Sequence, residues 1–131
     1  MNIQHINPTT LAPPGGHYSH ATVANGFVFI SGQLPITPAG EKLNQASFEE
    51  QARQVLANVQ AALEAAGSSV AQLLQVRVYV TDIEQWPEFN RIDQQWAGAA
   101  PPARAVVPVP LLHYGFLIEV EAVGVVELLQ K

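Results

Sequence analysis

The stretch Ala21-Thr22-Val23-Ala24-Asn25-Gly26-Phe27-Val28-Phe29-Ile30-Ser31 decides how the fold begins. Two runs rich in β-branched and aromatic residues flank Asn25-Gly26, a dipeptide that accepts the positive φ required at both central positions of a type I′ turn. We therefore predict a β-hairpin of strands 21–24 and 27–31. The preceding segment 11–16 contains too much proline and glycine for regular structure, so we predict an irregular loop there.

A capping box marks the start of the first helix, because Ser47 is followed three positions later by Glu50. Apolar side chains then repeat at helical spacing up to Gly67, which predicts an amphipathic helix with one face on a sheet. Later segments predict a strand at 73–80, a helix at 87–96, and strands at 105–109 and 117–127. This order predicts a single α+β domain over residues 1–131, with a mixed sheet and two helices on one of its faces.

Composition limits the class of function. The chain of 131 residues has a net charge of −5 with its six basic residues scattered, which argues against a nucleic-acid partner. It has no cysteine, so disulfides and thiolate chemistry are absent. No signal-like leader or long apolar run appears, so we expect a cytoplasmic protein without a membrane partner. With 13% charged and 48% hydrophobic residues, we expect apolar surface to be covered by other subunits.

Two charged residues interrupt apolar stretches near the C-terminal end. Arg104 lies within PPARAVV at 101–107, and Glu119 lies within LIEVEAV at 117–123. A charge in a buried strand needs a partner or a function, and the planar guanidinium matches a carboxylate. We interpret Arg104 as a receptor for a small anionic metabolite and Glu119 as a group that holds a water. The alternative is an internal salt bridge between Arg104 and Glu119 or Glu121.

Alternation along the last strand places Glu119 and Glu121 on one face, opposite Ile118 and Val120. Two helices cover only one face of the sheet, so we expect the other face to pack against further subunits, with Glu119 at a subunit boundary. The alternative is a solvated edge strand whose charges deter aggregation.

Four motifs in order resemble one known family, the Rid (YjgF, L-PSP) reactive-intermediate deaminases. They are GFVFISGQLP at 26–35, QARQVLANV at 51–59, PAR at 102–104 and IEVEA at 118–122. The resemblance extends from about Tyr18 to Val126 and implies a chorismate-mutase-like α+β fold. It also implies a homotrimer in which the sheets line a central barrel and three clefts lie between subunits.

Members of the deaminase type hydrolyse 2-imino acids and their enamine tautomers to 2-keto acids and ammonia, without metal or cofactor. By this resemblance, Arg104 binds the substrate carboxylate and Glu119 handles the hydrolytic water. Tyr18, Ser31 and Asn90 match positions that line the cleft, and the main chain of Val106 matches a contact to the substrate nitrogen or the water.

The chain also departs from the family pattern. Ala105 stands where a serine or threonine usually follows the arginine, Val106 stands where many members have cysteine, and the loop 113–116 is more aromatic than usual. These changes leave the substrate open. His113 lies either at the cleft mouth or in solvent. His17 and His20 diverge along an extended stretch, so we predict no metal site. A non-catalytic module that binds small carboxylates is the main alternative function, and a ribonuclease is a less favoured one.

Overall fold

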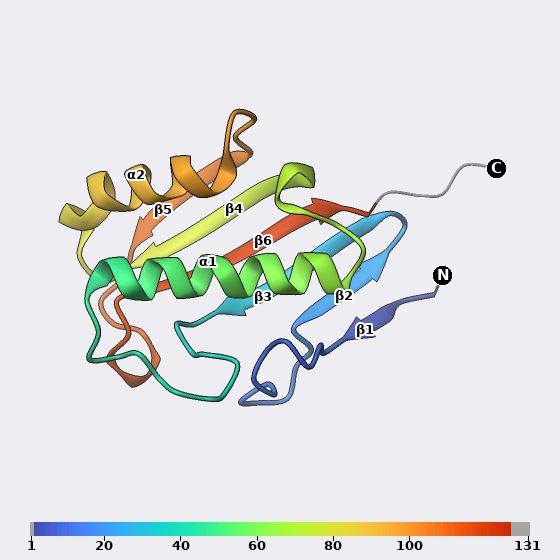
Figure 1. Cartoon of the computed structure of the whole chain (residues 1–131), viewed down its shortest axis with the longest axis horizontal. Helices are drawn as coiled ribbons and strands as arrows, with labels where there is room; N and C mark the ends of the chain where they lie inside the picture. Colours follow the sequence, from blue (N-terminus) through green and yellow to red (C-terminus); the bar gives the residue numbers. More distant parts are fainter. Residues whose placement is uncertain (1, 127–131) are drawn as a thin grey trace.

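The computed structural model describes residues 2–126, which form one six-stranded mixed sheet with both long helices on the same face (Figure 1). The strands are β1 (Gln4–Ile6), β2 (Ala21–Ala24), β3 (Phe27–Gln33), β4 (Leu73–Val80), β5 (Ala103–Pro108) and β6 (Ile118–Val125). The helices are α1 (Phe48–Ala65) and α2 (Trp86–Ala97), with 3₁₀ turns at Val70–Gln72, Ile83–Gln85 and His113–Gly115. The strand order is β1-β2-β3-β6-β4-β5, and β4 and β5 form the parallel pair.

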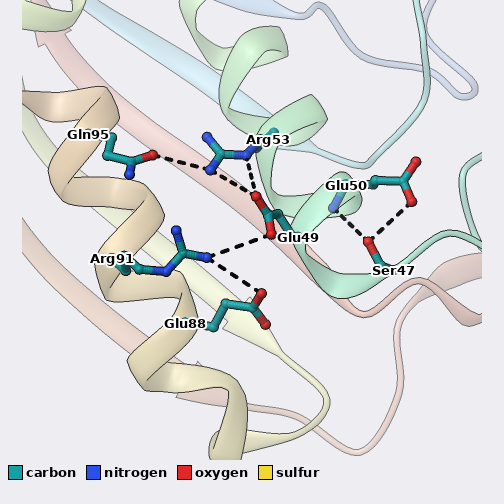
Figure 2. A network of polar contacts seen from close by, with 7 residues as sticks. All are labelled: Ser47, Glu49, Glu50, Arg53, Glu88, Arg91 and Gln95. Atoms are coloured by element: carbon teal, nitrogen blue, oxygen red, sulfur yellow. Dashed lines mark hydrogen bonds and ion pairs between the residues drawn. The ribbon is translucent and has the colours of Figure 1, made fainter.

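The structure contains the turn and the helix start that the local sequence signals predict. Asn25 and Gly26 have φ values of 53° and 79°, so the β2–β3 hairpin closes through the expected turn. Ser47 caps α1, because its hydroxyl accepts a hydrogen bond from the Glu50 amide at 3.1 Å (Figure 2). The α+β class and the two helices on one face are confirmed. Glu127, the predicted end of the last strand, lies outside the described residues.

The structure contains one strand that the sequence does not predict, and it excludes one alternative for the last strand. The edge strand β1 has three residues and is mostly exposed, so it carries no hydrophobic pattern that would predict it. β6 lies between β3 and β4 in the interior of the sheet. The alternative in which residues 117–127 form a solvated edge strand is therefore wrong, and the charges of Glu119 and Glu121 do not protect a sheet edge.

The core lies between the sheet and the helices. Val28, Val78 and Val120 from the sheet are fully buried there against Val55 and Val59 of α1. The other face of the sheet is covered by no helix of residues 2–126 (Figure 1). We call it the open face, and it consists of Phe27, Phe29, Arg77, Tyr79, Val107, Glu119, Glu121 and Val123. An open face that contains two half-exposed phenylalanines fits the expectation that other subunits cover it.

We predict that Phe29→Asp prevents the expected packing of subunits on the open face, because it places an unpaired carboxylate in the apolar part of that face. Phe29 is 50% exposed, and Ile83, in the 3₁₀ turn Ile83–Gln85 outside the sheet, is a control at 42%. Sedimentation at micromolar concentration should give a trimer for the unmodified chain and for Ile83→Asp, and a monomer for Phe29→Asp. A monomeric unmodified chain would contradict the subunit packing itself.

Exposed ion pairs fix α2 against the first turns of α1 (Figure 2). Arg53 bonds to Glu49 at 2.9 Å within α1 and to Gln95 of α2 at 3.2 Å. Arg91 of α2 lies 3.7 Å from the other oxygen of Glu49 and 3.8 Å from Glu88. Each exposed pair contributes at most about 1 kcal/mol, so their effect is to set the helix register. That register determines which side chains α2 presents to the neighbouring strand β5.

Candidate active site

A cavity of about 600 Å³ opens where β3 ends and β6 begins. Its wall includes the N-terminal loop 11–16, the strand end 31–34, Lys42 and the aromatic loop at His113 and Tyr114. Three of the predicted site residues line it: Tyr18, Ser31 and Glu119. Arg104, Asn90 and Val106 are not part of its wall.

The carboxylate of Glu119 lies directly over Gly32 at the end of β3. A Cβ on Gly32 would collide with Glu119 Oε2, so the absence of a side chain makes room for the carboxylate. Burial raises the pKa of Glu119 above its ordinary value, with a smaller lowering by His113 and a smaller raising by Glu121. A carboxylate with a raised pKa is a stronger proton acceptor, which suits a group that takes a proton from water.

The raised pKa predicts that Glu119→Gln stabilises the protein at neutral pH. A carboxyl whose pKa is higher in the folded state contributes stability below its unfolded pKa and loses it as pH rises through the folded pKa. At pH 7 the ionised, half-buried Glu119 therefore lowers the free energy of unfolding. A neutral glutamine removes this cost. Thermal unfolding should give a higher Tm for Glu119→Gln at pH 7 and no difference near pH 4. An equal or lower Tm at pH 7 would contradict a net cost of the ionised Glu119 in the folded state.

Glu121 differs from Glu119 although both lie on the open face. The Tyr79 hydroxyl donates a hydrogen bond to Glu121 Oε1, and this bond is the main reason that the pKa of Tyr79 is raised. No hydrogen bond to the Glu119 carboxylate occurs among residues 2–126. Glu119 is therefore the one of the two acids that can bind a water or a ligand without giving up a protein partner.

Hydrogen bonds fix Ser31 in the cavity wall. Its hydroxyl donates to the carbonyl oxygen of Ser19 at 2.6 Å, and its amide donates to the carbonyl oxygen of His20 at 2.9 Å. Because the hydroxyl proton is used, Ser31 offers oxygen lone pairs to a ligand and would accept a hydrogen bond from an N–H group. Tyr18 is 47% exposed, and its ring lies edge-to-face with that of His20, with 6.0 Å between the ring centroids.

The buried His20 holds the N-terminal loop against the sheet. Its Nε2 donates to the carbonyl oxygen of Ala12 at 2.7 Å, and its Nδ1 accepts from Gln33 Nε2 at 3.1 Å. Both ring nitrogens are occupied, so His20 serves the cavity wall and is not available as a ligand. Within the described ranges, no three His, Asp or Glu side chains lie close enough to hold a metal ion.

Arg104 lies elsewhere, at the edge of the sheet beneath α2. Its Nη1 donates to Asp93 Oδ2 at 2.8 Å, and its guanidinium carbon is 6.0 Å from the ring centroid of Trp86 and 5.8 Å from that of Phe89. The alternative in which Arg104 pairs with Glu119 or Glu121 is wrong. The buried face of α2 supplies a nearer carboxylate.

The sheet register separates Arg104 from Glu119. Arg104 aligns with Val76, which aligns with the buried Ala122, so Arg104 lies on the helix-covered face. Glu119, three positions from Ala122, lies on the open face. The two Cα atoms are two strand spacings and three residues apart, or roughly 14 Å. A small imino acid cannot bridge them within one chain.

The predicted residues therefore form two groups. The first is Tyr18, Ser31 and Glu119 around the cavity. The second lies under α2, where Asn90 is one helical turn before Asp93, and Val106 shares the face of Arg104 two residues further along β5.

Two residues of these groups were missed by sequence reasoning. Asp93 carries a detectable signal, because it is a charged residue on the apolar face of α2 beside Phe89 and Ile92. Gly32 carries none, since its role depends on the position of Glu119 across the sheet. His113 was left open between cavity mouth and solvent, and the structure places it in the cavity wall, close enough to lower the pKa of Glu119.

The chain is similar to known proteins over most of its length. The family model described as Endoribonuclease L-PSP matches residues 9–126. A RutC family protein of Pyrococcus horikoshii is 40% identical over 111 residues, which are 85% of this chain and 88% of that protein. The crystal structure of RidA from the Antarctic bacterium Psychrobacter superposes with a TM-score of 0.89 at 32% identity, covering 94% of this chain and 99% of that one.

A second solved structure carries a ligand. E. coli TdcF with bound serine has a TM-score of 0.88 and 31% identity to this chain, covering 95% of this chain and 99% of that one. No helix within residues 2–126 is long and apolar enough to cross a membrane.

Proposed function

Because this chain belongs to the Rid (YjgF, L-PSP) family, we propose that it is a hydrolytic deaminase of small 2-imino acids and their enamine tautomers. The products are 2-keto acids and ammonia. The observation that carries the proposal is the division of the site into two groups. One group has the Arg104 guanidinium, which can bind a substrate carboxylate. The other has a cavity lined by the Glu119 carboxylate, which is free to hold a water.

We propose that the complete site forms between two copies of the chain in a homotrimer. The group of Arg104, Asn90 and Val106 from one copy would meet the group of Tyr18, Ser31 and Glu119 from the next. This arrangement accounts for two otherwise separate features: the roughly 14 Å separation within one chain, and the uncovered open face.

The chemistry follows from these positions. Arg104 holds the substrate carboxylate, and Glu119 takes a proton from a water as the water oxygen bonds to the imine carbon. The π electron pair of the protonated C=N bond moves to nitrogen, which becomes a neutral amino group. Glu119 passes the proton that it took from water to this amino group and is a carboxylate again. It then removes the hydroxyl proton of the carbinolamine as the C=O bond forms, the C–N bond breaks, and neutral ammonia leaves with the electron pair of that bond. Ser31, which presents only lone pairs, would accept a hydrogen bond from the substrate N–H.

The direct test generates an imino acid in situ with an L-amino acid oxidase and adds the trimeric protein. We expect faster appearance of keto acid and ammonia, and less imine captured by semicarbazide. No change in either product would remove the enzymatic proposal.

A non-catalytic module that binds small carboxylates remains the second candidate. The serine bound to E. coli TdcF supports it, because that ligand has a carboxylate and a nitrogen but no C=N bond. Such a module would bind keto and amino acids without accelerating imine hydrolysis. A ribonuclease is disfavoured by the net charge of −5. We place the activity in the cytoplasm, where a chain without cysteine is at no disadvantage.

A further inference from the structure

We infer that Asp93 selects ligands at Arg104 by their charge. It favours a carboxylate accompanied by a positive charge, as in a protonated imino acid, over a carboxylate alone, as in the keto-acid product. The inference rests on the proposed function, since it takes Arg104 as the residue that binds the substrate carboxylate. It is carried by the ion pair between Arg104 Nη1 and Asp93 Oδ2 at 2.8 Å.

The Asp93 carboxylate is a fixed part of this site. Its side chain is 11% exposed and that of Arg104 is 23% exposed, so both are sheltered from solvent. The rings of Trp86 and Phe89 flank the guanidinium. α2 packs into the core through the fully buried Phe89 and Ile92, which leaves little freedom for the adjacent Asp93 to withdraw.

Asp93 occupies only part of the guanidinium. One hydrogen bond between the two side chains is present in the described part of the chain, and it uses Nη1. A guanidinium has five N–H donors in a planar fork, so Nη2 and Nε can still bind a second carboxylate. Arg104 would then hold two carboxylates with one positive charge.

This charge balance distinguishes substrate from product. Arg104, Asp93 and a keto acid together carry a net charge of −1, whereas the same residues with a protonated imino acid are neutral. Two carboxylates on one guanidinium repel each other in a partly desolvated site, and a positive nitrogen on the ligand offsets that repulsion. Hydrolysis converts a favoured ligand into a disfavoured one, so Asp93 promotes release of the keto acid.

The test compares two stable ligands by calorimetry on the assembled protein, with all 131 residues present. 2-Ketobutyrate represents the product, and zwitterionic 2-aminobutyrate represents the protonated imino acid. Asp93→Asn removes the charge but keeps an amide oxygen that accepts from Nη1. We expect Asp93→Asn to lower the Kd of 2-ketobutyrate about tenfold and the Kd of 2-aminobutyrate less than about threefold. Glu88→Gln, which removes an acid that pairs with Arg91 on the same helix, should leave the ratio of the two Kd values unchanged.

Equal changes in Kd for both ligands would mean that Asp93 is a structural residue and would overturn the inference. Asp93→Ser is a second neutral variant, and failure of both variants to assemble would overturn it as well. Arg104→Lys separates this question from the proposed function. If that variant binds 2-ketobutyrate normally, the carboxylate role of Arg104 fails. If it binds weakly while Asp93→Asn leaves the Kd ratio unaltered, only the charge selection fails.

Discussion

Arg104→Lys should lower kcat/KM for a 2-imino acid by about 10²-fold while the fold and the trimer persist. Lysine keeps the positive charge but cannot form the planar, two-pronged contact with a carboxylate. Each charged hydrogen bond contributes roughly 1.5–3 kcal/mol, and 1.36 kcal/mol corresponds to tenfold in rate. Loss of one such bond accounts for most of the expected decrease. Initial rates of imine hydrolysis and sedimentation of the same sample provide the measurement.

The matched control is Arg91→Lys, on the exposed side of α2, where the arginine lies 3.7 Å and 3.8 Å from its acidic partners. It should retain full activity. Unchanged kcat/KM in Arg104→Lys would mean that the Arg104–Asp93 pair is structural, and dissociation of the trimer would give the same conclusion.

The fold was largely predictable because its signals are local. The turn at Asn25-Gly26 and the cap at Ser47 each specify backbone geometry within four residues, and the structure contains both. The strand β1 was not predictable, because its three residues, two of them exposed, gain their structure only by pairing with β2. Its existence depends on a partner that a pattern within the strand cannot reveal.

The candidate site was predictable in its residues but not in its geometry. Arg104 and Glu119 are conspicuous because each interrupts an apolar stretch. Their placement on opposite faces follows from the register of β4 with both β5 and β6, which no single segment encodes. The pairing of Arg104 with Asp93 depends further on how α2 lies over β5. Long-range packing thus determines which carboxylate neutralises the arginine and which remains free.

Glu119→Gln should have the largest effect on the chemical step, lowering kcat by about 10² to 10⁴-fold, as expected for loss of a general base. Glutamine fills the same space over Gly32 but cannot accept a proton from water. Affinity for a keto acid should change little, because Arg104 holds the carboxylate. Single-turnover imine hydrolysis and binding of 2-ketobutyrate separate these two effects.

Glu121→Gln is the internal control for this prediction. It removes an acid from the same face of the same strand, two residues away, but that acid already accepts the hydrogen bond of Tyr79. A glutamine oxygen can still accept from the tyrosine, so we expect a small change in kcat. The pKa of Glu119 should also fall slightly, since Glu121 raises it. Wild-type turnover in Glu119→Gln, or a greater loss in Glu121→Gln, would show that Glu119 does not handle the water and would favour the binding module, in which Arg104 alone needs to act.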